Sequence, residues 1–109
     1  MKPFRQGDVL IIPVRSTPKL GAKIGRDRGR IVLAYGEVTG HAHAIKDRDA
    51  DLFEIEGLDD RFLRVLHEGG VNLDHEEHAT ITLPARKRGG YIVRTQREYT
   101  PEAIVRVAD

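Results

Sequence analysis

A short apolar run near the amino terminus, Val9-Leu10-Ile11-Ile12-Pro13-Val14, sets the pattern that much of this chain repeats. The run is short, rich in β-branched residues, and flanked by the turn-forming segments 6–8 and 16–18. These features favour a buried β-strand over a helix. Pro13 near the end of the run indicates a sheet edge or a bulge, because proline has no N–H to donate to a neighbouring strand.

Similar segments recur along the chain, each separated from the next by polar or glycine-containing turns. Further strands are predicted at 30–35, 41–46, 52–57, 61–66, 79–83 and 91–99. The last two are predicted to pair as a β-hairpin around the basic loop 85–90. Residues 19–30 carry three glycines among basic residues, and they are predicted to form a mobile loop.

The final segment has the signals of a helix start. Thr100 suits the N-cap, Pro101 the first helical position and Glu102 the first turn, so a short C-terminal helix is predicted. Six to seven strands with one terminal helix predict an all-β fold, either a small barrel or a sandwich. With 109 residues, the chain is expected to form a single domain over residues 1–109.

The composition excludes several kinds of protein. The absence of cysteine excludes disulfides and thiolate metal sites, and no apolar run approaches the ~18 residues that a membrane helix requires. The chain has 18 Lys and Arg residues and 17 Asp and Glu residues, so its net charge is close to zero and gives no general attraction to nucleic acid. No secretory signal is visible at the amino terminus, and a cytoplasmic protein without membrane association is expected.

Four of the five histidines fall in two short clusters, Gly40-His41-Ala42-His43 and His75-Glu76-Glu77-His78. Residues two apart on a strand share a face, so His41 and His43 would present two imidazoles side by side. His75 and His78 reach the same side only if their segment is a turn or helical. The fifth histidine, His67, is isolated beside a glycine pair and is expected to be structural.

The leading hypothesis from these clusters is a metal site. Neutral imidazole is the commonest protein ligand for zinc and also suits other transition metals, so the expected cofactor is a divalent ion of zinc, iron, manganese or nickel. The predicted ligands are the four clustered histidines, His41, His43, His75 and His78. Nearby carboxylates could act as a ligand, as a partner of a ligand or as a general base, and these are Glu37, Glu76 and Glu77.

A metal-dependent hydrolase acting on a phosphoester-type substrate is the weaker extension of this hypothesis. Its catalytic candidates are His41, His43, His78 and Glu37. Its candidates for contacting substrate are Thr39, Arg97 and Tyr99, of which Arg97 and Tyr99 share a face of the last predicted strand. Two of these have a plainer alternative, since Thr39 could be a turn residue and Tyr99 could pack against the C-terminal helix.

Two other kinds of function remain open. A metal-independent ribonuclease or phosphodiesterase could use one histidine as general base and another as general acid. Basic residues would then stabilise the charge of the transition state, and the candidates are Arg86, Lys87, Arg88, Arg94 and Arg97. Alternatively, the chain is a binding module without catalysis, with loops 19–30 and 85–90 contacting nucleic acid or an acidic protein. The expected partners are a small-molecule or nucleic-acid substrate, with a homo-oligomer as a further alternative.

Four motifs resemble those of a group of small bacterial and phage proteins. They are Gln6-Gly7-Asp8-Val9-Leu10, Gly36-Glu37-Val38-Thr39-Gly40-His41-Ala42-His43, His75-Glu76-Glu77-His78 and Gln96-Arg97-Glu98-Tyr99-Thr100-Pro101. The resemblance covers almost the whole chain and marks the histidine clusters, but it implies no particular chemistry. A looser likeness to cupin metal sites would align His41, His43 and Asp47 with the first cupin motif, and His75 or His78 with the second.

Overall fold

The computed structural model describes residues 2–36 and 38–96, and it confirms that this part of the chain is all-β. Ten strands follow one another: β1 (Phe4–Gln6), β2 (Val9–Val14), β3 (Leu20–Lys23), β4 (Ile31–Tyr35), β5 (Ala42–Ile45), β6 (Ala50–Ile55), β7 (Arg61–Val65), β8 (Val71–Asp74), β9 (Ile81–Leu83) and β10 (Gly90–Thr95). This exceeds the six to seven strands expected. The predicted C-terminal helix lies outside the described residues. Within them, no helix could cross a membrane.

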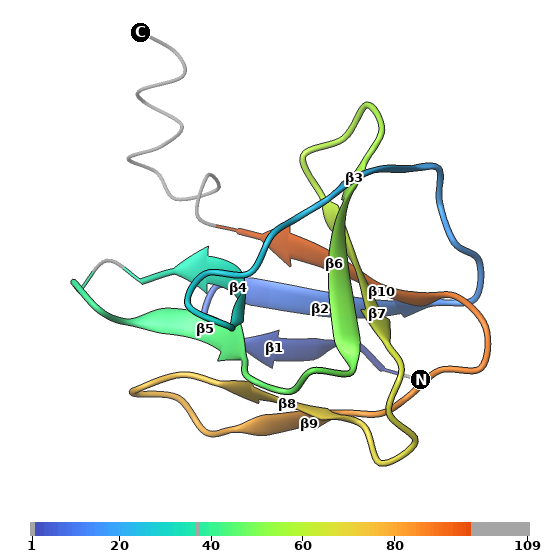
Figure 1. Ribbon diagram of the computed structural model, residues 1–109. Coiled ribbons are helices and arrows are strands. Elements are labelled where there is room, and N and C mark those ends of the chain that lie inside the picture. The colour runs from blue at the N-terminus through green and yellow to red at the C-terminus, as the bar shows by residue number, and fades with distance from the viewer. Residues whose placement is uncertain (1, 37, 97–109) are drawn as a thin grey trace, which may run out of the picture.

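The strands form two antiparallel sheets (Figure 1). The larger sheet has the strand order β1-β2-β10-β7-β6-β3, and the smaller has the order β4-β5-β8-β9. Neither sheet closes on itself in the described part of the chain, and both contribute to one core. Of the two predicted alternatives, the fold is therefore the sandwich and not the barrel.

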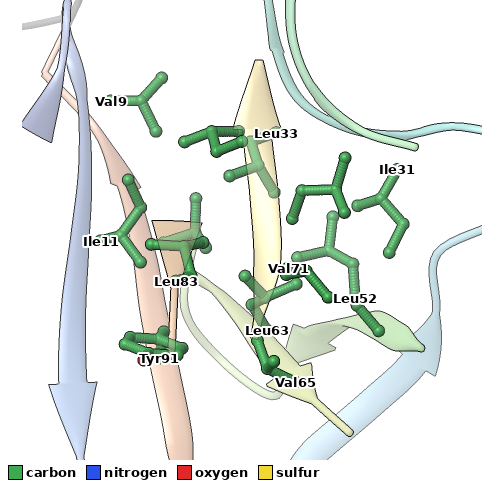
Figure 2. Packing of buried hydrophobic residues seen from close by; sticks show 14 residues of the cluster. Val9, Ile11, Ile31, Leu33, Leu52, Leu63, Val65, Val71, Leu83 and Tyr91 are labelled. Carbon is green, nitrogen blue, oxygen red and sulfur yellow. The ribbon is translucent and has the colours of Figure 1, made fainter. Parts of the chain in front are cut away.

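The core lies between the sheets, and strand alternation explains which residues enter it. β2 contributes Val9 and Ile11, and β4 contributes Ile31 and Leu33. Residues two apart point to the same face of a strand, so one face of each strand is buried and the other is partly exposed. Figure 2 shows these side chains gathered with others, including Tyr91 of β10.

The prediction for the first strand is confirmed, including the position of its proline. β1 pairs with β2 as far as Ile11, whereas β10 pairs with β2 as far as Val14. Pro13 therefore lies where β2 has only one neighbouring strand, as expected for a residue that cannot donate a ladder hydrogen bond. β1 itself was not predicted. It reaches β2 through a two-residue turn, Gly7-Asp8, in which Gly7 has a φ of 59°.

The predicted hairpin between residues 79–83 and 91–99 is wrong. β9 pairs with β8 in the smaller sheet, whereas β10 lies between β2 and β7 in the larger one. The basic loop 85–90 consequently crosses from one sheet to the other. Turn residues in a sequence mark where a strand ends, but they do not determine which strand it pairs with, and here a distant partner is preferred.

The prediction that residues 19–30 form a loop is also wrong in part. Leu20–Lys23 is strand β3, which pairs with the edge of β6. Beyond it, the guanidinium of Arg26 donates hydrogen bonds to the backbone carbonyls of Gly29, Asp47, Arg48 and Ala50. The glycines indicated an irregular segment, but the open edge of β6 and the Arg26 contacts give it defined partners.

Candidate functional site

The two histidine clusters meet at one end of the sandwich, on the left in Figure 1. The turns that join β1 to β2, β4 to β5 and β8 to β9 all reach this end. Between them lies a surface cavity of about 310 Å³. Its lining residues are Gly7, Asp8, Gly36, Val38, His41, His43, His75, Glu77 and His78.

His75 lies in the middle of the four imidazoles. Its ring centroid is 4.3 Å from that of His43, 4.8 Å from that of His78 and 5.7 Å from that of His41. The centroids of His43 and His78 are 5.9 Å apart. Two imidazoles that bind one ion at about 2.1 Å have centroids roughly 4.6–5.3 Å apart, from simple tetrahedral and octahedral geometry. Of the four measured separations, that of His75 and His78 lies within this range, and the other three lie just below or above it.

His43 is buried, and the opposite sheet holds its ring in place. The side-chain amide of Gln6, on β1, donates to the backbone carbonyls of Leu73 and Ala79, at 3.0 Å each. The amide oxygen of Gln6 therefore faces Nδ1 of His43, at 2.8 Å, and accepts a hydrogen bond from it. In the neutral imidazole the proton is then on Nδ1 and the lone pair on Nε2. Nε2 lies 3.7 Å from Oδ1 of Asp8.

His75 has the opposite arrangement. Its Nδ1 accepts a hydrogen bond from the backbone N–H of Glu77, at 3.0 Å. The proton of the neutral ring is therefore on Nε2. His67 does not line this cavity. Its Nδ1 also accepts a hydrogen bond from the backbone N–H two residues later, that of Gly69, at 3.0 Å. The contact is thus a local turn feature, which agrees with the structural role expected for His67.

The second cluster also supplies a carboxylate beside the histidines. Oε1 of Glu76 accepts a hydrogen bond from the N–H of Ala42, at 2.8 Å, which extends the pairing between β5 and β8. This hydrogen bond is the main cause that lowers the pKa of the Glu76 carboxyl below its ordinary value. Each of His41, His75 and Glu76 offers a ligand atom, and these three atoms lie within 4.8 Å of one another.

Gly7 allows the β1–β2 turn to approach the histidines closely. A Cβ atom at this position would lie 2.9 Å from Nε2 of His78 and 3.2 Å from Cε1 of His43. Its φ of 59° also lies in the left-handed region that side chains disfavour. A side chain at this position would therefore strain the turn and displace at least one of the two imidazoles.

The other candidates from the sequence are distributed differently. Thr39 lines a neighbouring cavity of about 280 Å³, not the histidine cavity. Asp47, which the cupin likeness aligned with a ligand, instead accepts the backbone N–H of Asn72. Glu37, Arg97 and Tyr99 lie outside the described residues.

The basic residues proposed to stabilise a transition state do not line the histidine cavity among the described residues. Arg86, Lys87 and Arg88 line a separate cavity with Arg15, and Arg94 forms an ion pair with Asp60. The basic residues 86–88 lie away from the histidines because the 85–90 loop crosses from the smaller sheet to the larger one. The predicted hairpin had no such crossing.

Gln6 and Asp8 were not identified as site residues from the sequence. Gln6-Gly7-Asp8 has the composition of an ordinary turn, and only its place in a motif pointed to more. Their proximity to His43 depends on the packing of β1 against the smaller sheet, for which the sequence carries no local signal.

A family model described as a domain of unknown function, DUF8820, matches residues 5–96. The match covers most of the chain, including both histidine clusters, and the chain belongs to this family. No curated protein and no solved structure matches the chain.

Proposed function

We propose that this member of the DUF8820 family binds a divalent transition-metal ion in the histidine cavity. The observation that carries the proposal is the arrangement around His75, whose ring lies 4.3–5.7 Å from those of His41, His43 and His78. Four neighbouring imidazoles, two of which (His41 and His75) bring a ring nitrogen within 4.8 Å of each other and of a Glu76 oxygen, form a donor set that suits zinc, iron or nickel.

The surroundings of His43 support this proposal. Histidine ligands commonly donate their second ring N–H to a carbonyl or carboxylate oxygen, which fixes the ring and directs the other nitrogen to the metal. The Gln6 oxygen is such a partner for His43. The proximity of Asp8 Oδ1 to Nε2, at 3.7 Å, also suits a cation bound between them. Gln6 would therefore position His43, and Asp8 would contribute negative charge.

Hydrolysis of a phosphoester is the reaction that we propose for the loaded site. A bound divalent ion would polarise a phosphoryl oxygen and acidify a water ligand. Within the described part of the chain, we propose Glu77 as the proton acceptor, because its carboxylate is exposed, lines the cavity and lies 3.9 Å from Nδ1 of His41.

Elemental analysis of the untagged protein, purified without chelator, tests the metal proposal. We expect close to one equivalent of metal in the wild type and in His67→Ala, and loss of metal in the double variant His41→Ala/His78→Ala. His67→Ala is the matched control because it removes an imidazole from the same kind of turn, away from the cavity. The absence of metal after incubation with zinc, iron, manganese and nickel would refute the proposal.

A second candidate function is supported by the proximity of His43 and His75. His43 has its proton on Nδ1, so Nε2 would act as the general base. His75 would act as the general acid in its protonated form, in which Nδ1 no longer accepts the hydrogen bond from the Glu77 N–H. Their ring centroids are 4.3 Å apart. A histidine pair of this kind could cleave a phosphodiester without a metal.

The two candidates differ in their response to chelator. Metal-dependent hydrolysis should disappear with chelator and return with one added ion. Histidine acid–base cleavage of a short RNA should persist in chelator with a bell-shaped pH profile, and it should be lost in His75→Ala but retained in His67→Ala. Activity that requires metal would exclude the second candidate.

A further inference from the structure

A second cavity adjoins the histidine site and shares one of its residues. This cavity, of about 280 Å³, is lined by Asp27, Arg28, Arg30, Tyr35, Thr39, Gly40, His41 and Ala42. His41 lines both cavities, so a molecule bound in one could extend past this imidazole into the other. The chemistry of the second cavity therefore bears on what the histidine site could act on.

Two arginines, Arg28 and Arg30, line the second cavity. Arg28 and Arg30 come from the turn before β4, where Asp27 and Arg30 form an isolated antiparallel bridge. Arg28 has a φ of 54°, the one positive value among the described residues other than glycine. Such a conformation is unfavourable for a side chain of this size and often occurs where a functional group must be held in a given direction.

The side chain of Arg26 links the turn that carries these arginines to the segment that leads into β6. Arg26 donates to the carbonyl of Gly29 within the turn and to three carbonyls in residues 47–50. Holding the turn in advance lowers the entropic cost of ordering its arginines around a ligand. The segment is therefore suited to binding, in contrast to the loop expected from its glycines.

Among the described residues that line this cavity, positive charge exceeds negative charge. In that set, Arg28 and Arg30 are accompanied by a single carboxylate, that of Asp27, which accepts a hydrogen bond from the hydroxyl of Tyr35. This hydrogen bond is the main cause that raises the pKa of the Tyr35 hydroxyl, and the positive charges of Arg30 and Arg28 act in the opposite direction. Within residues 2–36 and 38–96, neither guanidinium forms an ion pair.

We propose that Arg28 and Arg30 bind an oxyanion group of the substrate, a phosphate or a carboxylate, beside the histidine site. Guanidinium groups match the geometry of both oxyanions with paired N–H donors, and the hydroxyl of Thr39 offers an additional donor in the same cavity. The substrate would then be anionic at one end and would present its reacting bond to the histidines. That the bound oxyanion belongs to a substrate depends on the proposed function, but binding of the oxyanion to the two arginines requires no metal.

Titration of chelator-treated, full-length protein with inorganic phosphate, and separately with acetate, tests the inference. Backbone amide shifts in 28–30 and 39–42 should change and saturate with the preferred oxyanion. The variant Arg28→Gln/Arg30→Gln should weaken binding by about tenfold or more, because charge-assisted hydrogen bonds are lost. Arg28→Lys/Arg30→Lys should bind with intermediate affinity, because lysine keeps the charge but not the fork of donors.

The control Arg15→Gln/Arg88→Gln removes two arginines from a different cavity and should leave binding unchanged. An amide spectrum that is otherwise unchanged would show that the Arg28→Gln/Arg30→Gln variant is folded. No saturable shift, or equal affinity in the two double-glutamine variants, would overturn the inference. Metal uptake is measured on separate samples that were purified without chelator. Uptake of metal by a wild-type protein that shows no oxyanion binding refutes only the inference, whereas oxyanion binding by a protein that takes up no added zinc, iron, manganese or nickel refutes only the metal site.

Discussion

The side-chain oxygen of Gln6 accepts a hydrogen bond from Nδ1 of His43, at 2.8 Å, and this bond joins the two sheets at the histidine end of the sandwich. Gln6 is on the edge strand β1 of the larger sheet, and His43 is on β5 of the smaller one. Both residues are buried. One amide thus satisfies two polar groups of the smaller sheet and one of the turn between β8 and β9, and it sets the direction of a candidate ligand.

Replacing Gln6 with Met should affect both stability and metal binding. The variant leaves two carbonyls and the His43 N–H without their partner, so the free energy of unfolding should fall by about 2–4 kcal/mol. Metal affinity should fall by about 10–100-fold, as when other partners of ligating histidines are removed. Urea unfolding and metal titration measure the two effects. Gln96→Met, which removes an exposed contact with Arg5, is the control. Wild-type metal affinity in Gln6→Met would contradict the role assigned to this hydrogen bond.

Substitution of Gly7 by Ala should disturb the histidine site more than an equivalent change elsewhere. Gly7 and Gly57 both have positive φ values, 59° and 78°, so Ala at either position should cost about 1–3 kcal/mol in backbone strain. Only at Gly7 would the new Cβ meet His78 and His43, whereas at Gly57 it meets nothing within 4 Å. We expect Gly7→Ala to lose metal affinity and Gly57→Ala to keep it. Equal affinities in the two variants would count against close packing of the turn on the imidazoles.

Metal binding through His75 should release the amide of Glu77. In the structure, Nδ1 of His75 accepts a hydrogen bond from this N–H. If the metal binds Nε2 of the neutral ring, the proton moves to Nδ1; if the metal binds Nδ1, that lone pair is used, and in both cases Nδ1 can no longer accept the hydrogen bond. The Glu77 amide resonance should therefore shift, and its hydrogen exchange should accelerate, when one equivalent of metal is added. The Gly69 amide, bound in the same way to His67, is an internal control. A Glu77 amide that does not change at full metal occupancy would remove His75 from the ligand set.

The carboxylate of Glu76 should add to stability at neutral pH, and this contribution should be lost in acid. Its pKa is lowered in the folded protein, chiefly by the hydrogen bond from Ala42. The stabilisation is therefore present above its ordinary pKa of about 4.3 and is lost as the pH falls through the lower, folded value. Unfolding of chelator-treated protein between neutral and acid pH should show a smaller acid-induced loss of stability in Glu76→Gln than in the wild type. Parallel profiles would indicate that the carboxylate is not held by Ala42 in solution.

Much of the fold could be predicted from local patterns. Strand alternation predicts the buried residues of β2 and β4, and Pro13 lies where β2 has one neighbour. The pairing of β10 could not be predicted in this way, because the turn residues at 84–90 are equally compatible with a hairpin and with a crossing between sheets. β3 was missed because Gly21 within it, followed by Gly25 and Gly29, favoured a loop for a segment that pairing with the edge of β6 stabilises as a strand.

The sequence by itself determined the all-β class and the two histidine clusters, because strand period and residue type are local properties of a chain. Tertiary structure alone decided that the clusters meet around His75, that Gln6 reaches His43 from the other sheet, and that Arg28 and Arg30 adjoin His41. These relationships join residues on different strands and turns. They depend on which strand edges pair and how the two sheets pack, and that choice is made by the burial of one common core.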